Sequence, residues 1–443
     1  MNSTPQVSIS DGVDSLDPEK IAELGSSSNL DIDVATPGPG SRYEKVTREA
    51  LLNLVGGWLV MFATYGYIYS FGAYQDFYTR SNVASASSVS WIGSIQAFLV
   101  PSMGLISGRL LDLGYFRHTL AAGSLLYTLS LFMLSIAHPT RYYQIFLAQG
   151  IGMGLGAGLI YIPSIAIQSH HWGSRRPLAL GIIFSGSSVG GVVLPIMFNQ
   201  LLAHGVGFGW SVRATAFVVV AALGSANFLM SPPSDPNATE KHPPMDWKSM
   251  ATDLPYVLII VGSFCCLWGI FYPYFYTQLY AITHGVDPTV AFYTLAILNV
   301  SSIPGRIIPN VFSHELGVFN MLLASSFGSA VVILSLLGIK SIGGIIVYAI
   351  LSGFFSGAWF ALVAAAMASF SRHPGEIGIR MGVAFAFSSC GSLTGTPIDG
   401  ALLGHHFAWY KTVIFSGATI LGGTAIIAVS RQLVVARKGT HVI

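Results

Sequence analysis

The chain has 443 residues, of which 52% are hydrophobic and only 9% are charged, and its formal net charge is +2. Soluble domains carry about 25% charged residues, so this composition excludes an ordinary soluble domain and indicates many membrane-spanning segments. The small net charge argues against a nucleic-acid partner. The three cysteines lie inside apolar stretches, so no disulfide framework is expected.

Residues 1–48 are predicted to form a disordered cytoplasmic tail. Nine of the 19 acidic residues lie in the first 50 positions, among many Ser, Pro and Gly residues. A segment with few apolar residues and many charges cannot bury enough surface to fold alone. Because no apolar core precedes a cleavage site, we expect no signal peptide, and the first span should act as the insertion signal.

Twelve apolar stretches of about 20 residues follow, each long enough to cross about 30 Å of hydrocarbon. They are predicted at 51–75, 89–111, 118–138, 142–167, 177–201, 212–231, 254–280, 290–312, 318–338, 343–369, 378–402 and 409–431. The sequence therefore predicts an all-α membrane protein with two six-helix bundles, at 49–231 and 253–431. A polar, proline-rich linker at 232–252 joins them, and a short cytoplasmic tail at 432–443 ends the chain.

The distribution of Lys and Arg predicts that both termini face the cytoplasm. With the N-terminus inside, 16 of the 21 basic residues fall on the inner side and 5 on the outer side. Basic residues are enriched in cytoplasmic loops. The sequon at 237–239 then lies inside the cell and is not expected to be glycosylated. We expect the plasma membrane as the location, with the vacuolar membrane as the alternative.

The stretch 299–310 is the first candidate for a substrate site. Arg306 lies in an apolar span beside Pro304 and Pro309, and a charge at such depth normally faces a polar cavity or a partner. Transporters build midplane sites from helices that are broken in this way. The alternative is that Arg306 lies near the cytoplasmic end of its helix and extends to the lipid headgroups.

Several other polar or aromatic side chains inside the spans could line the same cavity. The candidates for substrate binding beside Arg306 are Tyr65, Tyr69, Asn299, Ser302, Tyr276 and Trp359. Aromatic residues at helical spacing are more often packing residues, so both interpretations stay open. For Tyr74 and Asp76, at the outer end of the first span, we favour an interfacial belt.

Asp399 is the one carboxylate of the eleventh predicted span and is the candidate for a proton site. Because it lies near the outer end of its helix, a solvated side chain is the favoured interpretation. The histidine pairs at 170–171 and 405–406 lack the spacing of a zinc site, so no metal and no cofactor are expected. The deep polar residues form no catalytic set, so an enzyme is not expected.

Glycines at 150, 152, 154, 156 and 158 lie in the fourth predicted span. No strand precedes them, which argues against a nucleotide-binding loop. Gly150, Gly154 and Gly158 share one helix face, while Gly152 and Gly156 share another. This spacing is typical of membrane helices that pack closely.

Two loop motifs carry a family resemblance. The stretch 108–117 resembles the loop after the second helix in the major facilitator superfamily, although one residue is missing between its Asp and its second Gly; an ordinary basic loop is the alternative. The stretch 170–186 is similar to the start of the fifth helix in monocarboxylate-porter-like members, and the sequences at 90–96 and 148–156 resemble those of the fungal branch. The residues assigned to conformational switching are Gly108, Asp112, Gly114, Arg117, Arg175 and Arg176.

The resemblance implies two bundles that alternate access to a central cavity. It also implies a small organic anion as cargo, a monocarboxylate or related metabolite, because Arg306 falls where those porters bind a carboxylate. Their acidic partner is replaced by Ser302, so proton coupling by that pair is not expected, and coupling to H⁺ stays open. The alternatives are a carrier of a neutral or aromatic metabolite or vitamin such as riboflavin, and a nutrient receptor without transport. Import or export, and the oligomeric state, are not predicted.

Overall fold

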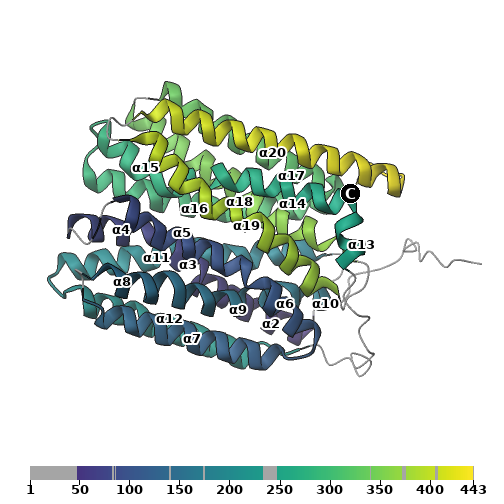
Figure 1. Cartoon of the computed structure of the whole chain (residues 1–443), viewed down its shortest axis with the longest axis horizontal. Helices are drawn as coiled ribbons and strands as arrows, with labels where there is room; N and C mark the ends of the chain where they lie inside the picture. The colour runs from purple at the N-terminus through teal and green to yellow at the C-terminus, as the bar shows by residue number, and fades with distance from the viewer. Residues whose placement is uncertain are drawn as a thin grey trace, which may run out of the picture. The chain divides into compact units, whose positions relative to one another are not determined.

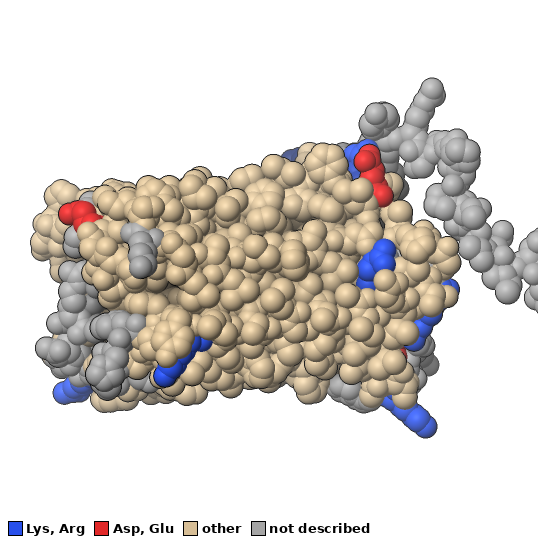
Figure 2. All heavy atoms as spheres, turned by 90° about the horizontal axis from the view of Figure 1, so that it is seen from above, with Lys and Arg blue, Asp and Glu red and all other residues tan. Residues whose placement is uncertain are grey.

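The computed structural model describes residues 47–81, 84, 86–138, 141–172, 175–232, 247–339, 341–371, 376–404 and 408–442. All regular elements among these residues are helical. Within them, 12 helical spans are long and apolar enough to cross a bilayer. Each overlaps one of the twelve predicted spans, so the predicted fold class is confirmed. On the face shown in Figure 2, acidic and basic side chains lie toward the two ends, and the surface between them is uncharged.

The helices of the two halves of the chain are as follows. The first half contains α2 (Arg48–Ala63), α3 (Tyr65–Tyr69), α4 (Phe71–Arg80), α5 (Ala86–Ser102), α6 (Gly104–Asp112), α7 (Phe116–Ile136), α8 (Tyr142–Ile145), a π-helical segment (Phe146–Gly152), α9 (Met153–Ala166), α10 (Gln168–Trp172), α11 (Arg176–Ala203) and α12 (Phe208–Leu229). The second half contains α13 (Trp247–Thr252), α14 (Leu254–Ile270), α15 (Tyr272–Thr283), α16 (Pro288–Leu316), α17 (Val318–Ser335), a 3₁₀ turn (Leu336–Gly338), α18 (Ile342–Ala368), α19 (Ile377–Leu403) and α20 (Trp409–Lys438).

The helices of the first half, purple to teal, lie together below those of the second half, green to yellow, in Figure 1. Because the spans alternate in direction, α2 begins and α20 ends at the same end of the structure, near the label C. We call this the terminal end. The opposite end, where α4 and α15 lie, is called the loop end.

Two helix pairings, which we call seams, join the halves. In seam A, α5 and α6 pack against α19; the Ser94 and Thr396 hydroxyl oxygens are 2.7 Å apart. A Cβ added to Gly382 would overlap the Gly104 carbonyl oxygen, so the backbones are in contact. In seam B, α11 packs against α16, and the Ser188 and Ser302 hydroxyl oxygens are 2.6 Å apart.

The glycines of the fourth span use two faces, as predicted. A Cβ on Gly154 or Gly158 would press against α5, close to Leu99. A Cβ on Gly152 or Gly156 would instead press against α7, where the Gly156 position lies against the Tyr127 backbone. Small residues therefore let α9 and the π-helical segment before it approach two neighbours closely, as is common between membrane helices.

The expectation of a broken helix at Arg306 is wrong, because α16 continues through both Pro304 and Pro309. Neighbouring helices in a membrane bundle can support a helix at proline in this way. The interruptions occur elsewhere. The first span breaks at Thr64, whose hydroxyl donates to the Val60 carbonyl, the second breaks two residues after Pro101, and the seventh breaks before Pro273. Proline removes a backbone donor, and threonine competes for carbonyls, so these breaks have local causes.

Two predicted boundaries also differ from the structure. Residues 247–252, assigned to the linker, form the short helix α13, and residues 432–438, assigned to the tail, continue α20. No Pro or Gly interrupts this extension until Gly439, whose φ of 67° ends the helix in the left-handed region. Residues 1–46 and 233–246, with the sequon, lie outside the described residues.

We predict that Gly156→Val destabilises the protein by about 1–3 kcal/mol, because the new side chain would overlap α7 in a packed interface. The matched control is Gly422→Val on α20, where no heavy atom lies within 4 Å of an added Cβ. Thermal melting in detergent would compare both variants with wild type. Equal melting temperatures for the two variants would contradict the packing argument.

Candidate functional site

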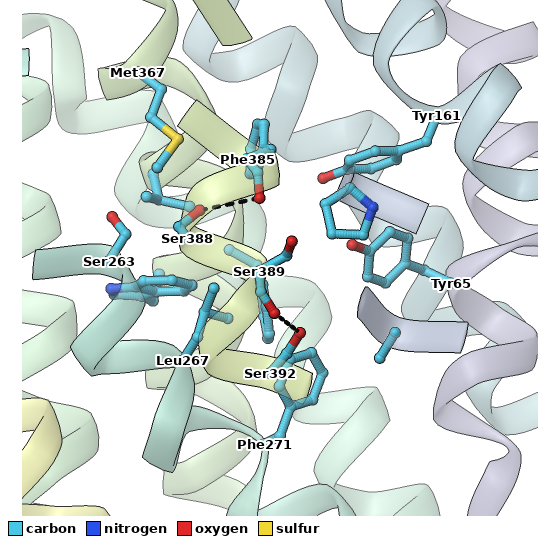
Figure 3. Close-up of a pocket in the computed structure, with 15 residues that line it drawn as sticks. Tyr65, Tyr161, Ser263, Leu267, Phe271, Met367, Phe385, Ser388, Ser389 and Ser392 are labelled. Atoms are coloured by element: carbon cyan, nitrogen blue, oxygen red, sulfur yellow. Dashed lines mark hydrogen bonds between the residues drawn. The ribbon is translucent and has the colours of Figure 1, made fainter. Parts of the chain in front are cut away.

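A cavity lies between the halves, where the interrupted spans meet (Figure 3). Its lining residues come from six helices and the Phe271 break between α14 and α15: Tyr65, Ala97, Pro101, Tyr161, Ser263, Leu267, Phe271, Trp359, Phe360, Val363, Met367, Phe385, Ser388, Ser389 and Ser392. The cavity volume of about 20 Å³ has room for little more than one water molecule. A larger cargo therefore requires the halves to separate.

The cavity wall is aromatic and hydroxyl-bearing, and none of its lining residues carries a charge. Tyr65 and Tyr161, whose ring centroids are 5.0 Å apart, provide the aromatic rings on the side of the first half. Ser388 and Ser392 donate to carbonyls of their own helix and keep lone pairs as acceptors. Such a wall suits an apolar or aromatic molecule with a few hydrogen-bonding groups.

Two polar groups of the cavity have no hydrogen-bond partner among the described residues. They are the indole nitrogen of Trp359 and the hydroxyl of Ser263, and both atoms are buried. A buried polar group without a partner is costly, so such groups usually serve a ligand or a water molecule. Together they offer one donor and one hydroxyl that can donate or accept.

Only Tyr65 and Trp359 of the predicted substrate residues line this cavity. The contribution of α19, where Ser388, Ser389 and Ser392 face the cavity, was not predicted from the sequence (Figure 3). Their spacing of three or four residues in an otherwise apolar span was the available signal, since it places them on one helix face.

Arg306 lies in seam B and is fully buried. Its Nη1 donates to the Phe184 carbonyl and the Ser187 hydroxyl of α11, and its Nη2 donates to the Tyr69 hydroxyl at 3.3 Å. The proposed extension to the headgroups is therefore wrong in this conformation. The guanidinium instead links the two halves, and of its nitrogens only Nε is buried without a partner in the described part of the chain.

Asn299 and Ser302 lie on the same face of α16 as Arg306 and also contact α11. The Asn299 amide donates to the Leu295 carbonyl at 3.1 Å and to the Gly191 carbonyl at 3.4 Å. All three predicted residues thus contribute to seam B rather than to the cavity wall. Because their side chains pair across the halves, they become available to a cargo only when this seam opens.

Tyr69 connects Arg306 with the cavity region. The Arg306 guanidinium carbon is 5.4 Å from the Tyr69 ring centroid, a distance at which a cation and a ring attract one another. The same ring lies 5.9 Å from that of Tyr65 and 6.3 Å from that of Phe360, both in the cavity wall. One layer of aromatic rings therefore separates the buried charge from the cavity.

Two expectations about the outer parts of the spans are wrong. Asp399 is 0% exposed instead of solvated, and it accepts a hydrogen bond from Ser416. Tyr74 is buried and bonded to the Tyr67 hydroxyl, so it belongs to the core and not to an interfacial belt. The Asp76 side chain lies outside the described set. Tyr276 donates to the Thr396 carbonyl at 2.9 Å, near Asp399 and away from the cavity.

The loop motif after the second span closes seam A at the terminal end. The Asp112 carboxylate accepts from the Ile379 backbone N–H at 2.9 Å, in the first turn of α19. A negative charge is favourable at this position, because the N-terminus of a helix carries partial positive charge. Gly108 lies against the Gly378 carbonyl, where a side chain would not fit. Gly114 adopts a φ of 83°, a conformation that favours glycine. Arg117 is exposed and forms no ion pair with Asp112.

The second motif lies between α10 and α11, also at the terminal end. Arg175 is exposed, whereas the Nε and Nη2 atoms of Arg176 are buried and have no partner among the described residues. The Nε2 atom of His171 is 3.2 Å from the Asn53 amide nitrogen. Burial lowers the pKa of His171, which favours the neutral ring that can accept from Asn53. The side chain of His170 lies outside the described set.

The family profile described as Major Facilitator Superfamily matches residues 51–344. The chain belongs to this superfamily. The match covers the six spans of the first half, apart from the first three residues of α2, and the first three spans of the second half. The protein is therefore a membrane transporter of a small molecule, and not an enzyme.

Several fungal proteins are similar to this chain over most of its length. The MFS-type transporter pynF of Aspergillus niger is 36% identical over 88% of this chain and 90% of its own length. The aspyridones efflux protein apdF of Emericella nidulans is 36% identical over 82% of this chain and 74% of its own. The agnestins efflux protein AgnL12 of Paecilomyces divaricatus is 35% identical over 87% and 88%.

Among solved structures, the transporter FucP in its outward conformation is similar, with a TM-score of 0.64. It covers 86% of this chain and 98% of its own, at 15% sequence identity. A likeness at this identity concerns the fold alone. It agrees with the twelve helical spans of the structure.

We predict that Asp112→Asn opens the terminal end of seam A more often. The amide can still accept from Ile379 but loses the attraction of a charge to the helix end, worth about 0.3–1 kcal/mol. The population with separated halves should rise about two- to fivefold. Electron–electron distance measurements between labels at Leu113 and Ser369, with the native cysteines replaced, would detect this change.

The control for this measurement is Asp253→Asn. Asp253 also lies at the terminal end, but its ion pair with Arg437, at 2.6 Å, joins two helices of the same half. This variant should leave the label distances unchanged. An identical distance distribution in wild type and Asp112→Asn would disprove a closing role for Asp112.

Proposed function

We propose that this transporter exports a secondary metabolite with an aromatic or largely apolar body. The cavity chemistry carries the proposal: aromatic walls, hydroxyl groups, two unsatisfied polar atoms and no charged lining residue. The names of two relatives, efflux proteins for aspyridones and agnestins, support both the direction and the cargo class. A vitamin carrier or a receptor without transport is not favoured.

The proposed mechanism is alternating access through the two seams. The cavity is too small for such a cargo, so binding requires seam A or seam B to open at one end while the other end stays closed. In seam A the backbones touch at glycines, and both seams contain pairs of hydroxyl groups. Such surfaces can separate and close again without leaving a charge unpaired. The exceptions are Arg306 and Asp112, whose charged groups lose their partners when a seam opens.

Within the cavity, Tyr65 and Trp359 are proposed as the main contacts, and Tyr161 and Phe385 as further ring contacts. Rings of this kind give large apolar contact areas, and Trp359 can donate its indole N–H to a carbonyl or hydroxyl of the cargo. Ser263 adds a hydroxyl that no described residue uses. Gly108, Asp112, Gly114, Arg117, Arg175 and Arg176 are proposed to act on conformational switching at the terminal end.

An acidic cargo is the second candidate, and one observation favours it. The Nε of Arg306 is buried without a partner, and its other donors bind neutral acceptors only. An anion entering an opened seam B would replace these acceptors with a stronger, charge-assisted partner. In this proposal Tyr69, Asn299 and Ser302 lie beside the anion. Membership of the monocarboxylate-porter-like subgroup stays a prediction from the loop sequence.

For the topology we propose that the terminal end faces the cytoplasm, because most of the Lys and Arg residues in the described part of the chain lie there. The plasma membrane is the proposed location, since export from the cell requires it. The two bundles, 49–231 and 253–431, are proposed as the units that move.

Expression in a yeast strain without its own drug exporters would test the function. Cells would be loaded with aspyridones, agnestins or simple monocarboxylates, and the retained amount would be measured over time. Faster loss of an aromatic metabolite than in cells with an empty vector supports the proposal. Uptake or loss of monocarboxylates alone would overturn it.

We predict that Trp359→Phe weakens the apparent affinity for an exported metabolite about two- to tenfold. The substitution keeps an aromatic ring but removes a donor, and one hydrogen bond contributes about 0.5–1.5 kcal/mol. The control is Trp268→Phe, because Trp268 lies outside the cavity lining and donates to Thr394 instead. Concentration-dependent export in vesicles would give both values. An unchanged affinity in Trp359→Phe would remove this residue from the site.

We predict that Arg306→Lys separates the two roles of the guanidinium. Lysine keeps the charge but not the planar fork that reaches several acceptors. If Arg306 binds an anionic group, export of an acidic metabolite should lose at least about tenfold in apparent affinity, while a neutral metabolite is unaffected. Equal losses for both cargoes would mean that Arg306 only holds seam B together.

A further inference from the structure

A second polar cluster lies away from the cavity, within the helices of the second half. Asp399 of α19 is at its centre, with 0% of its surface exposed. Its Oδ1 accepts from the Ser416 hydroxyl of α20 at 3.0 Å. Its Oδ2 is buried and has no hydrogen-bond partner among the residues that the structure describes. Asp399 is seven residues beyond Ser392 of the cavity wall, about 10 Å along the helix.

No cation in the described part of the chain neutralises this carboxyl group. The ion pairs formed between two described residues are Arg380 with Glu376 and Arg437 with Asp253, both at the terminal end. An ionised carboxylate that is removed from water without a partner costs several kcal/mol. One hydroxyl donor cannot offset this cost, whereas a protonated carboxyl group avoids it.

The groups that face Asp399 are neutral hydroxyls. Tyr272 and Tyr276 of α15 and Tyr348 of α18 lie within electrostatic range of the carboxyl group. The Tyr348 hydroxyl is buried beside the hydroxyls of Ser352 and Thr277, and the Tyr272 hydroxyl accepts a long bond of 3.5 Å from Thr412 of α20.

The other packed helices bring no nearby charge. From α14, the titratable groups inside the span are Tyr256, Cys265 and Cys266, while α5 has no titratable residue. On α9 the titratable group is Tyr161, which lies at the cavity, and Arg109 and Asp112 of α6 lie at the terminal end. On α20, Tyr410 and Lys411 are exposed at the loop end.

We propose that Asp399 is a proton-binding site, occupied by a proton in this conformation and emptied when the helices around it separate. The step forms and breaks one O–H bond of the carboxyl group and takes the proton from water or returns it to water. Coupled to cargo movement, one proton entering the cell would drive one cargo molecule out. The coupling depends on the proposed export function, whereas the protonation of Asp399 does not.

Infrared difference spectroscopy of the full chain in lipid nanodiscs tests the protonation without any cargo. At neutral pH, wild type minus Asp399→Asn should contain the C=O stretching band of a protonated carboxylic acid. Wild type minus Asp253→Asn should contain only bands of an ionised carboxylate, because Asp253 is paired with Arg437. Carboxylate bands in the Asp399 difference would overturn the proposal.

Ser416→Ala provides a second measurement if Asp399→Asn does not fold. Removing the hydroxyl takes away the hydrogen bond to Oδ1 and keeps the acid, so the protonated band should remain and shift in frequency. If the C=O band of the protonated acid is absent or unshifted in Ser416→Ala, Asp399 is not the group that produces this band.

The coupling is tested with a metabolite that wild type has been found to export. In vesicles, one pH unit should change the accumulation ratio about tenfold for one proton per cargo. Asp399→Asn should still exchange labelled for unlabelled cargo but should lose this dependence on the pH gradient. Gradient-driven accumulation equal to wild type would overturn the coupling. An absence of transport by wild type would instead disprove the export function and leave the infrared result to decide the proton site.

Discussion

Hydrocarbon offers no hydrogen-bond partners, so each polar group within the spans must be satisfied by another part of the protein. Arg306 is the largest such demand, because it is a fully buried charge. Its partners belong to α11 and α3, on the other half of the chain. This requirement fixes the position of α16 relative to α11 in seam B. It also fixes the place of the Tyr69 ring, which packs on the guanidinium, and so the width of the cavity behind that ring.

The same constraint explains why the cavity and the charge are separate. A charged group in the cavity wall would need a counter-ion in every conformation, including the closed one described here. Hydroxyls can instead bond to carbonyls of their own helix, as Ser388 and Ser392 do, and still accept from a guest. The phenylalanine rings of the wall need no hydrogen-bond partner at all. The wall can therefore close on a very small volume and open again at low electrostatic cost.

The sequence was sufficient for the twelve spans and the close-packing glycines, because apolar length and residue spacing determine both directly. It singled out Arg306 by its charge, but could not show that Phe184 and Ser187 of a distant helix already bind it. Asp399 was expected in water because its place along the chain is near a helix end. Its burial depends on α15, α18 and α20, which pack around it, and such contacts cannot be counted from one span. The serines of α19 were overlooked for a similar reason, since only the seam shows which face of the helix meets the cavity.

Seam A has a mechanical consequence. At Gly104 with Gly382, and at Gly108 with Gly378, the two helices touch through their backbones, without side chains that interlock. When such surfaces separate, no side chain has to leave a groove on the neighbouring helix or change its rotamer. The helices can therefore slide or tilt against one another with little friction. The time between one opening and the next should then be set by a few hydroxyl pairs and the Asp112 carboxylate, rather than by slow repacking of a core.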